Sequence, residues 1–445
     1  FISSRLLQLL FPHDFAFFRS QSFHTTMSKP LEVKKDLFWV GTLNPEMRIF
    51  DVVNKTKFGT TYNSFILRGS KATVLFETVL FETWSEYEKK LDAVLKPGEK
   101  IDYIVLNHTE PDHSGCLGLV VDRFPDAKII ATSPGLRNIG LIWNRTFTNT
   151  MVAGCRNGIS ELDIGGYTLH FILAPMLHWP DTMITHIPEL KTIVTCDFFG
   201  VHFSSPLVFN DLIEKNPDEK LVLQSQFRYY YQCIMSPFSA QVEQALKKIE
   251  PLAFDTICPS HGPVIRANID WYVQELHSLA RGIMTARSCD KPLVLIAFVT
   301  TYHYTEAIAH AISSALQEDG LDVELHDLQK EPSSAILSRL PHASGLLLGT
   351  PTYASEGVPP VMDVATRLNP IIHAGMVMGA FGSYGWSGEG VKNIHGRLTQ
   401  LSPRVHVPLP PMSVLFKPSE DELGKCVEWA HKFAFAVKNN GKLPE

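Results

Sequence analysis

One loop of this chain reads Asn107-His108-Thr109-Glu110-Pro111-Asp112-His113-Ser114-Gly115, directly after an apolar run that ends at Leu106. Its side chains that can bind a metal are His108, Glu110, Asp112 and His113. Bringing two imidazoles and two carboxylates this close is costly, through lost hydration and like-charge repulsion, unless a cation compensates. We therefore interpret the loop as part of a metal site and not as a purely structural cluster.

Three further candidate ligands each follow directly on a short apolar run: His178, Asp197 and His261. Taken singly, the two histidines would be ordinary loop residues, and Asp197 could be a solvent-facing strand end or a helix cap. Their order after the first loop is what makes them candidates. His186 and His202 stand outside this pattern, and we expect them to be structural.

The surrounding sequence alternates short runs rich in Val, Ile, Leu or Phe with segments of helical periodicity, which predicts a mixed α/β domain over residues 29–287. The predicted strands are Ala72–Phe76, Tyr103–Leu106, Lys128–Ala131, Leu169–Ala174, Thr192–Thr195 and Thr256–Cys258. The predicted helices include Trp84–Leu95 and Ala240–Ile249.

A polar stretch, Ala286–Pro292, separates this pattern from a second one, which predicts another domain over residues 291–441. Its predicted strands are Leu293–Phe298, Leu321–Leu328, Gly345–Leu348 and Met376–Phe381, with a helix at Glu306–Glu318. Strands that alternate with helices at this spacing predict a parallel, doubly wound sheet of about five strands.

The ligand order H-x-E-x-D-H, then His, Asp and His resembles the metallo-β-lactamase fold, a four-layer αββα sandwich with a binuclear site at its strand ends. Hydrolases of that superfamily have His where this chain has Glu110, and Glu at this position is the pattern of flavodiiron proteins. A hard, anionic carboxylate in place of an imidazole favours iron over zinc. The resemblance implies one iron bound by His108, Glu110 and His178, a second bound by Asp112, His113 and His261, and Asp197 as the bridge between them.

The C-terminal half resembles flavodoxin, in which three loops bind FMN beyond the carboxyl ends of the strands. The first loop is Thr300-Thr301-Tyr302-His303-Tyr304-Thr305, whose hydroxyls and free N–H groups at a helix start suit a phosphate. The other two are Thr350-Pro351-Thr352-Tyr353-Ala354 and Gly382-Ser383-Tyr384-Gly385-Trp386-Ser387-Gly388, with aromatics that can stack on a flavin and glycines that allow close approach. His303 departs from the family, which usually has Gly within this loop.

The likeness to flavodiiron proteins runs from about Val33 to the end of the chain, in both domains and in the same order. It implies a minimal, two-domain oxidoreductase that passes electrons from FMN to the irons and reduces O2 to water, NO to N2O, or both. Its electrons would come from a separate donor, a rubredoxin-like protein or a flavin reductase. The resemblance also implies a head-to-tail homodimer or a dimer of dimers, in which FMN and iron meet across the interface. Oxygen scavenging is the activity we expect first.

Two other classes stay open at this point. One is a binuclear zinc hydrolase fused to a flavin domain, against which Glu110 argues. The other is a non-enzymatic flavin-binding or interaction module with a relict metal site, against which the complete set of seven ligand-type side chains argues.

Composition excludes several further classes of protein. The net charge of -6 over 445 residues gives no electrostatic reason to expect nucleic acid or an anionic membrane as a partner. No uninterrupted apolar run approaches the roughly 18 residues that a membrane span needs. The seven cysteines never form a C-x-x-C pair, which argues against an iron–sulfur site or a disulfide framework and favours a reducing compartment.

Residues 1–28 are expected to be an N-terminal extension outside the fold. Up to residue 26 it holds Arg5, Arg19 and several serines but a single acid, Asp14, and Met27 reads like a natural start. These 26 residues fit an organellar presequence, and they fit equally well upstream sequence translated in error. The expected location is therefore cytoplasmic, or organellar if the presequence is genuine.

Overall fold

The computed structural model describes residues 29–444 apart from 51–53, 155–157, 288–290 and 371–372, so the predicted N-terminal extension lies outside the described residues. The chain divides into two compact units. The first runs to Tyr230 and includes Lys247–Tyr272, and the second holds Tyr231–Leu246 and the chain from Val273 onward. Helices α7 (Ser239–Ile249) and α8 (Ile269–Arg287) each cross this division, and the limits at residues 287 and 291 stay a prediction.

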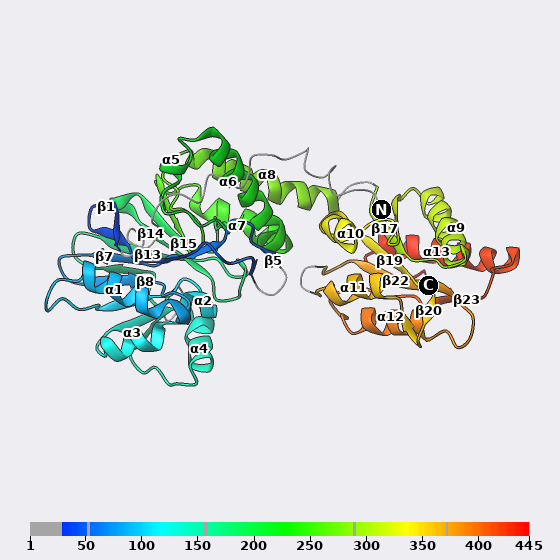
Figure 1. Ribbon diagram of the computed structural model, residues 1–445, viewed down its shortest axis with the longest axis horizontal. Coiled ribbons are helices and arrows are strands. Elements are labelled where there is room, and N and C mark those ends of the chain that lie inside the picture. Colours follow the sequence, from blue (N-terminus) through cyan, green and yellow to red (C-terminus); the bar gives the residue numbers. More distant parts are fainter. Residues whose placement is uncertain (1–28, 51–53, 155–157, 288–290, 371–372, 445) are drawn as a thin grey trace, which may run out of the picture. The chain divides into compact units, whose positions relative to one another are not determined.

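The first unit contains two sheets (Figure 1). The strands of the seven-stranded sheet are, in spatial order, β1 (Leu31–Lys34), β2 (Leu37–Trp39), β7 (Phe65–Arg68), β8 (Thr73–Phe76), β9 (Tyr103–Val105), β10 (Lys128–Ala131) and β11 (Thr150–Val152). Those of the five-stranded sheet are β12 (Glu161–Asp163), β13 (Thr168–Leu173), β14 (Met183–Ile187), β15 (Thr192–Cys196) and β16 (Thr256–Pro259). The unit also contains two small two-stranded sheets, β3 (Thr42–Asn44) with β6 (Thr60–Tyr62) and β4 (Ile49–Phe50) with β5 (Asn54–Lys55).

Helices cover the outer faces of the two sheets (Figure 1). The seven-stranded sheet carries α1 (Trp84–Val94), α3 (Leu117–Arg123) and α4 (Ser133–Ile142), and on the side of the five-stranded sheet lie α5 (Asn210–Ile213) and α6 (Pro217–Tyr230). Side chains that alternate along a strand divide between two cores because successive residues face opposite sides. In β9, Val105 packs with Phe171 between the sheets, whereas Ile104 packs with Leu91 of α1. The four layers form the αββα sandwich that the sequence predicts.

The second unit is built on a five-stranded parallel sheet. Its strands are, in spatial order, β18 (Asp322–Asp327), β17 (Leu293–Phe298), β19 (Gly345–Gly349), β22 (Val377–Tyr384) and β23 (Met412–Leu415). This order, 2-1-3-4-5 along the chain, is that of flavodoxin-like folds, so the predicted doubly wound sheet is confirmed. Its helices are α9 (Tyr304–Glu318), α10 (Ser333–Arg339), α11 (Pro359–Arg367), α12 (Glu389–Thr399) and α13 (Glu420–Lys438).

Both faces of this sheet are buried, which explains the nearly continuous apolar sequence of its central strands. Val294 and Ile296 of β17 pack on the side of α9 and α13, where the rings of Trp429 and Phe433 stack with centroids 5.7 Å apart. The intervening Leu295 packs on the opposite side, with α10, α11 and α12. A capping box at Ser419 begins α13.

Two details differ from the sequence-based expectation. Strand β22 continues to Tyr384, so the third predicted loop starts within the strand and not after it. The second loop contains a short hairpin, β20 (Thr352–Tyr353) with β21 (Glu356–Gly357), whose two-residue strands are too short to show a sequence period. None of the helices in the described part of the chain combines the length and apolar character that crossing a bilayer requires.

Candidate metal centre and flavin cradle

The seven predicted ligands lie together at one end of the first unit, each just beyond a strand of one of its two sheets. His108 and Glu110 follow β9 directly. Asp112 and His113 lie in α2 (Pro111–Ser114), a short helix that begins with proline in its first turn, where the missing N–H costs nothing. The other three follow the five-stranded sheet: His178 after β13, Asp197 after β15 and His261 after β16. We call these seven residues the metal centre.

Four side chains form the first group of the metal centre, with one ligand atom from each within 4.8 Å of the others: His108, Glu110, His178 and Asp197. Glu110 Oε2 lies 3.2 Å from His108 Nε2 and 3.3 Å from His178 Nε2. Asp197 Oδ2 lies 3.1 Å from His178 Nε2. Atoms at these separations can share one ion, because each could reach it over an ordinary coordination bond.

A second group contains Asp112, His113 and His261. His261 Nε2 lies 3.2 Å from Asp112 Oδ2. The other carboxylate oxygen of Asp197, Oδ1, faces this group and lies 3.0 Å from His113 Nε2 and 3.5 Å from His261 Nε2. The two oxygens of Asp197 therefore belong to different groups, which is the arrangement that a bridging carboxylate needs.

Hydrogen bonds on the far side of two imidazoles direct their Nε2 atoms into the metal centre. His261 Nδ1 donates to the carbonyl oxygen of Thr61 at 2.7 Å, and a carbonyl can only accept. His108 Nδ1 lies 3.3 Å from Asp181 Oδ1. Because these bonds engage Nδ1 in both rings, Nε2 is the nitrogen that a metal ion would bind once it replaces the Nε2 proton, as in most protein metal sites.

The charges of the metal centre are balanced from within. Burial lowers the pKa of His108, but hydrogen bonds to Asp181 and Glu110 outweigh burial and raise the pKa to about 10. The pKa of His178 is also raised to about 10, since its bonds to Asp197 and Glu110 outweigh burial. Burial raises the pKa of Asp197, but the surrounding histidines outweigh it and hold the pKa well below its usual range. Protons on the imidazoles thus supply the positive charge that balances the carboxylates, and bound metal cations would supply it in their place.

The donor set fits a pair of hard or borderline metal ions. Several buried atoms have no hydrogen-bond partner among the described residues: both oxygens of Asp112, Nε2 of His113 and Oδ1 of Asp197. Orphaned buried polar atoms are rare unless an ion or water satisfies them. Imidazole and carboxylate ligands suit iron and similar ions. Cys196 also lies near His113; burial raises the pKa of its thiol well above the usual value, and its Sγ accepts a hydrogen bond from Ser260 Oγ at 3.0 Å.

The residues that support the ligands were missed by sequence reasoning. Asp181 accepts hydrogen bonds from Thr109 N at 2.8 Å and from Thr109 Oγ1 at 2.6 Å, in addition to its contact with His108. Glu77 accepts a bond from Asn107 N at 2.8 Å beneath the same loop, and burial raises its pKa to about 7. Asp181 stands three residues after His178 in the sequence, but only the fold shows that it faces His108.

Of the two histidines expected to be structural, His202 lies beside the metal centre. Its Nδ1 is 3.0 Å from Thr60 Oγ1, which is itself 3.2 Å from His261 Nδ1. Burial holds the pKa of His202 well below its usual value, so its ring is neutral. His186 lies elsewhere, with Nε2 3.3 Å from the carbonyl oxygen of Ala253.

The three predicted FMN loops lie together at the carboxyl end of the second sheet, and we call them the flavin cradle: Thr300–Thr305, Thr350–Ala354 and Gly382–Gly388. Direct contacts join them. Ser383 N donates to Thr305 Oγ1 at 3.4 Å, which links the third loop to the first. A Cβ atom on Gly382 would lie 1.9 Å from the carbonyl oxygen of Thr350, so the third and second loops approach as closely as glycine allows.

The flavin cradle fits FMN in two respects. Three aromatic rings, one from each loop, are left in solvent: Tyr302 is 73% exposed, Tyr353 74% and Trp386 96%. Rings of this size are normally packed, and exposed aromatic clusters mark binding sites. In the loop between β17 and α9, Thr300 Oγ1 is buried without a hydrogen-bond partner in the described part of the chain. A phosphate at this helix start would satisfy that hydroxyl.

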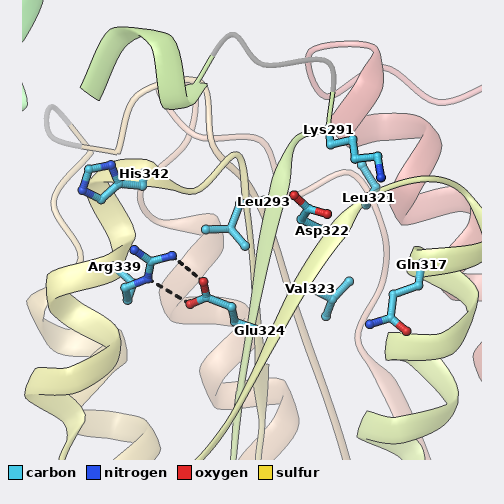
Figure 2. A pocket seen from close by; sticks show the side chains of 9 residues that line it. All are labelled: Lys291, Leu293, Gln317, Leu321, Asp322, Val323, Glu324, Arg339 and His342. Carbon is cyan, nitrogen blue, oxygen red and sulfur yellow. Dashed lines mark hydrogen bonds and ion pairs between the residues drawn. The ribbon is translucent and has the colours of Figure 1, made fainter. Parts of the chain in front are cut away.

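A separate hollow in the second unit lies away from the flavin cradle (Figure 2). Its walls include Leu293 and Asp322, the first residues of β17 and β18, so it opens at the amino ends of the strands, opposite the flavin cradle. Within it, Arg339 and Glu324 form a two-pronged ion pair, drawn as dashed lines in Figure 2. We assign no ligand to this hollow.

Comparison with known proteins agrees with the geometry of both sites. Residues 60–262 match the ODP family beta lactamase, and residues 296–429 match flavodoxin. The chain is 33% identical to a flavo-diiron protein of Clostridium acetobutylicum, over 92% of this chain and 99% of the relative. It is 30% identical to a nitric oxide reductase of Moorella thermoacetica, over 92% and 100% of the two chains.

A solved structure shows the same architecture over both units. The rubredoxin oxygen:oxidoreductase of the anaerobe Desulfovibrio gigas matches with a TM-score of 0.66 and 27% identity, and the match covers 92% of this chain and 99% of the other. The cofactors that accompany this combination of domains are FMN and a di-iron site. From the ligand geometry, the two matched domains and these relatives, the chain is an oxidoreductase that belongs to the flavodiiron proteins.

Proposed function

We propose that this protein reduces O2 to water at a di-iron centre that receives its electrons from FMN. The observation that carries the proposal is the position of Asp197, whose Oδ2 lies 3.1 Å from His178 Nε2 and whose Oδ1 lies 3.0 Å from His113 Nε2. One carboxylate thus faces two ligand groups, so two metal ions would lie close enough to act on one small molecule. The structurally similar protein of Desulfovibrio gigas is a rubredoxin oxygen:oxidoreductase, which supports oxygen as the substrate.

In this proposal the seven side chains would hold the irons as two sets, with Asp197 facing both. One iron would be held by His108, Glu110 and His178, and the other by Asp112, His113 and His261. Iron and FMN would supply electron transfer and a place for a diatomic molecule to bind. The protein's own part is to hold the ligands: Asp181 and the Thr61 carbonyl orient two imidazoles, and burial keeps the carboxylates from solvent.

Nitric oxide is a second candidate substrate, supported by the 30% identity to the nitric oxide reductase of Moorella thermoacetica. The same iron ligands and the same FMN would serve it. The electrons for either substrate would come from a separate protein, a rubredoxin-like donor or a flavin reductase. We further propose a head-to-tail homodimer, or a dimer of dimers, that brings the FMN of one chain to the irons of the other. A fully active enzyme that sediments strictly as a monomer would refute that assembly.

The decisive experiment measures metal content and turnover on the same preparation. Protein expressed with iron supplied is analysed for iron, zinc and manganese per chain, then reduced anaerobically and given O2 or NO while each gas is followed with an electrode. We expect about two irons per chain, with O2 consumed at the higher rate. Two zinc ions that iron cannot displace, with no uptake of either gas, would overturn the redox function in favour of a hydrolase. Faster uptake of NO would reverse the order of the two candidate substrates.

A further inference from the structure

One ligand of the metal centre, His261, stands on a short buried loop at the end of β16. We call residues Pro259–Gly262 the His261 loop, and all four are buried. Gly262 has a φ of 81°, and a Cβ atom there would lie 2.3 Å from Val201 Cγ1. Because the loop is closed to solvent on every side, its backbone N–H and C=O groups need partners inside the protein.

A single residue, Asn63, bonds three of the four carbonyl groups in this loop. Its Nδ2 donates to the oxygens of Pro259 and Gly262, each at 2.8 Å, and its backbone N–H donates to the oxygen of Ser260 at 2.8 Å. On the other side of the amide, the indole N–H of Trp39 donates to Asn63 Oδ1 at 2.8 Å. A carbonyl only accepts and an indole only donates, so the amide is fixed in one orientation, with its N–H groups toward the loop.

Thr61 holds the same loop two residues earlier in the chain. Its Oγ1 accepts a hydrogen bond from Gly262 N at 2.7 Å, and its carbonyl oxygen accepts the bond from His261 Nδ1. Residues two apart along an extended chain face the same side, which brings Thr61 and Asn63 to one loop. Both side chains are buried. We call these two residues the loop clamp.

The loop clamp reaches only one of the two ligand groups. In the described part of the chain, its side chains bond to the His261 loop and to Trp39, and to none of the loops that carry the first group. The first group has a support of its own, since Asp181 contacts His108. Supports behind a ligand commonly govern how tightly its metal ion is held.

We propose that the loop clamp positions His261 and thereby sets the affinity of the second ligand group for its metal ion, independently of the first group. The inference rests on the ligand assignment made under the proposed function. Thr61 and Asn63 are positioning residues that act through the imidazole and do not bind the metal ion themselves. The clamp acts on the ligand and not on the chemistry of the ion, so iron and zinc would both be affected.

Titration of the full-length protein with ferrous iron tests the proposal. Wild type, Asn63→Ala, Thr61→Val and Thr61→Ser are freed of metal and titrated without oxygen, in competition with a coloured chelator. The wild type should bind about two ions per chain. Asn63→Ala should weaken the binding of one ion about 10- to 100-fold and leave the other unchanged. Thr61→Val, which lacks the hydroxyl, should weaken the same ion, and Thr61→Ser should restore most of the affinity.

Two controls separate positioning from a general loss of stability. Asn210→Ala removes another buried amide of the same unit, which donates to Glu214 and to the Ala267 carbonyl, outside the His261 loop. This variant should melt at a lower temperature, as Asn63→Ala should, yet bind both ions normally. In a His261→Ala background, Asn63→Ala should change the metal affinity no further, because the clamp acts through that imidazole.

Unchanged binding of both ions in Asn63→Ala, or equal weakening of both, would overturn the proposal. A further loss of affinity in the His261→Ala background would also overturn it. If Asn63→Ala does not fold, the comparison of Thr61→Val with Thr61→Ser decides in its place. A wild type that binds two zinc ions and no iron would refute the redox function alone, and the same titration with zinc then decides the role of the clamp. Fewer than two ions of either metal in the wild type would overturn the ligand assignment and the clamp together.

Discussion

The metal centre and the flavin cradle are built in opposite ways. In the metal centre the side chains that would touch the cofactor are largely buried and already pair with one another, as with Asp197 between His113 and His178. In the flavin cradle the corresponding side chains point into solvent, and the ring of Trp386 is 96% exposed. The metal centre therefore depends on contacts among its own buried side chains, whereas the flavin cradle offers exposed rings for contact with its cofactor.

This difference follows from the chemistry of the two cofactors. Metal ions need several charged ligands in fixed positions, and buried charges are tolerated only where partners surround them. FMN brings its own large apolar ring and its own phosphate, so the protein needs only flat surfaces and free N–H groups. Changes at the metal centre should thus have large effects on iron alone, and changes at the flavin cradle smaller effects on FMN alone.

The largest effect is expected from Asp197→Asn, which removes the negative charge shared by both ligand groups. Turnover should be abolished while FMN stays bound, as measured by gas electrode and by flavin absorbance. His178→Ala, which alters only the first group, should also abolish turnover with FMN retained. If either variant keeps its activity, the ligand assignment is wrong.

Asp181→Asn should be the next most severe change, because the carboxylate orients His108 without belonging to either ligand group. Loss of such a supporting carboxylate typically weakens metal binding about 10- to 100-fold. Competition with a chelator measures the iron affinity. FMN content serves as the control, and a fall in FMN that matches the loss of iron would point to general unfolding instead.

Gly382→Ala tests whether FMN binding requires the close contact between the second and third loops of the flavin cradle. The new Cβ would lie 1.9 Å from the carbonyl oxygen of Thr350, so the second and third loops must separate. Relieving such a clash typically costs about 1–3 kcal/mol, which predicts roughly tenfold weaker FMN binding with unchanged iron content. Gly396→Ala, in α12 of the same unit, meets no atom within 4 Å and is the matched control. Equal FMN affinity in both variants would contradict the close contact.

Trp386→Ala should have the smallest effect of these five test substitutions. The ring is almost wholly exposed, so its loss should not change the melting temperature of the protein. Aromatic stacking is typically worth about 0.5–1.5 kcal/mol, which predicts FMN binding that is weaker by a few-fold. Trp386→Phe keeps a ring at the same place and should retain most of the affinity. If the alanine variant binds FMN with unaltered affinity, Trp386 does not stack on the flavin.

The sequence predicted most of the fold because strand ends and ligand types are local features. The structure has strands at the predicted residues Lys128–Ala131 and Leu293–Phe298. Glu110, within a single loop, was enough to distinguish flavodiiron proteins from the hydrolases of the same superfamily. The supporting contacts could not be predicted in this way, since they join residues that are far apart in the chain. Asp181 meets His108 across 73 positions, and Thr61 meets His261 across 200. Residues of ordinary type acquire such roles only through the three-dimensional fold.

The bond between His261 and the Thr61 carbonyl also has a consequence for biosynthesis. It spans 200 positions and joins β6, near the start of the first unit, to the end of β16, so the last imidazole of the metal centre is supplied late. A nascent chain still short of residue 261 lacks this ligand and has at most an incomplete second iron site. Under the proposed ligand assignment, loading of the second iron must therefore follow synthesis of nearly the whole first unit, whereas the flavin cradle is made only after that, from the C-terminal part of the chain.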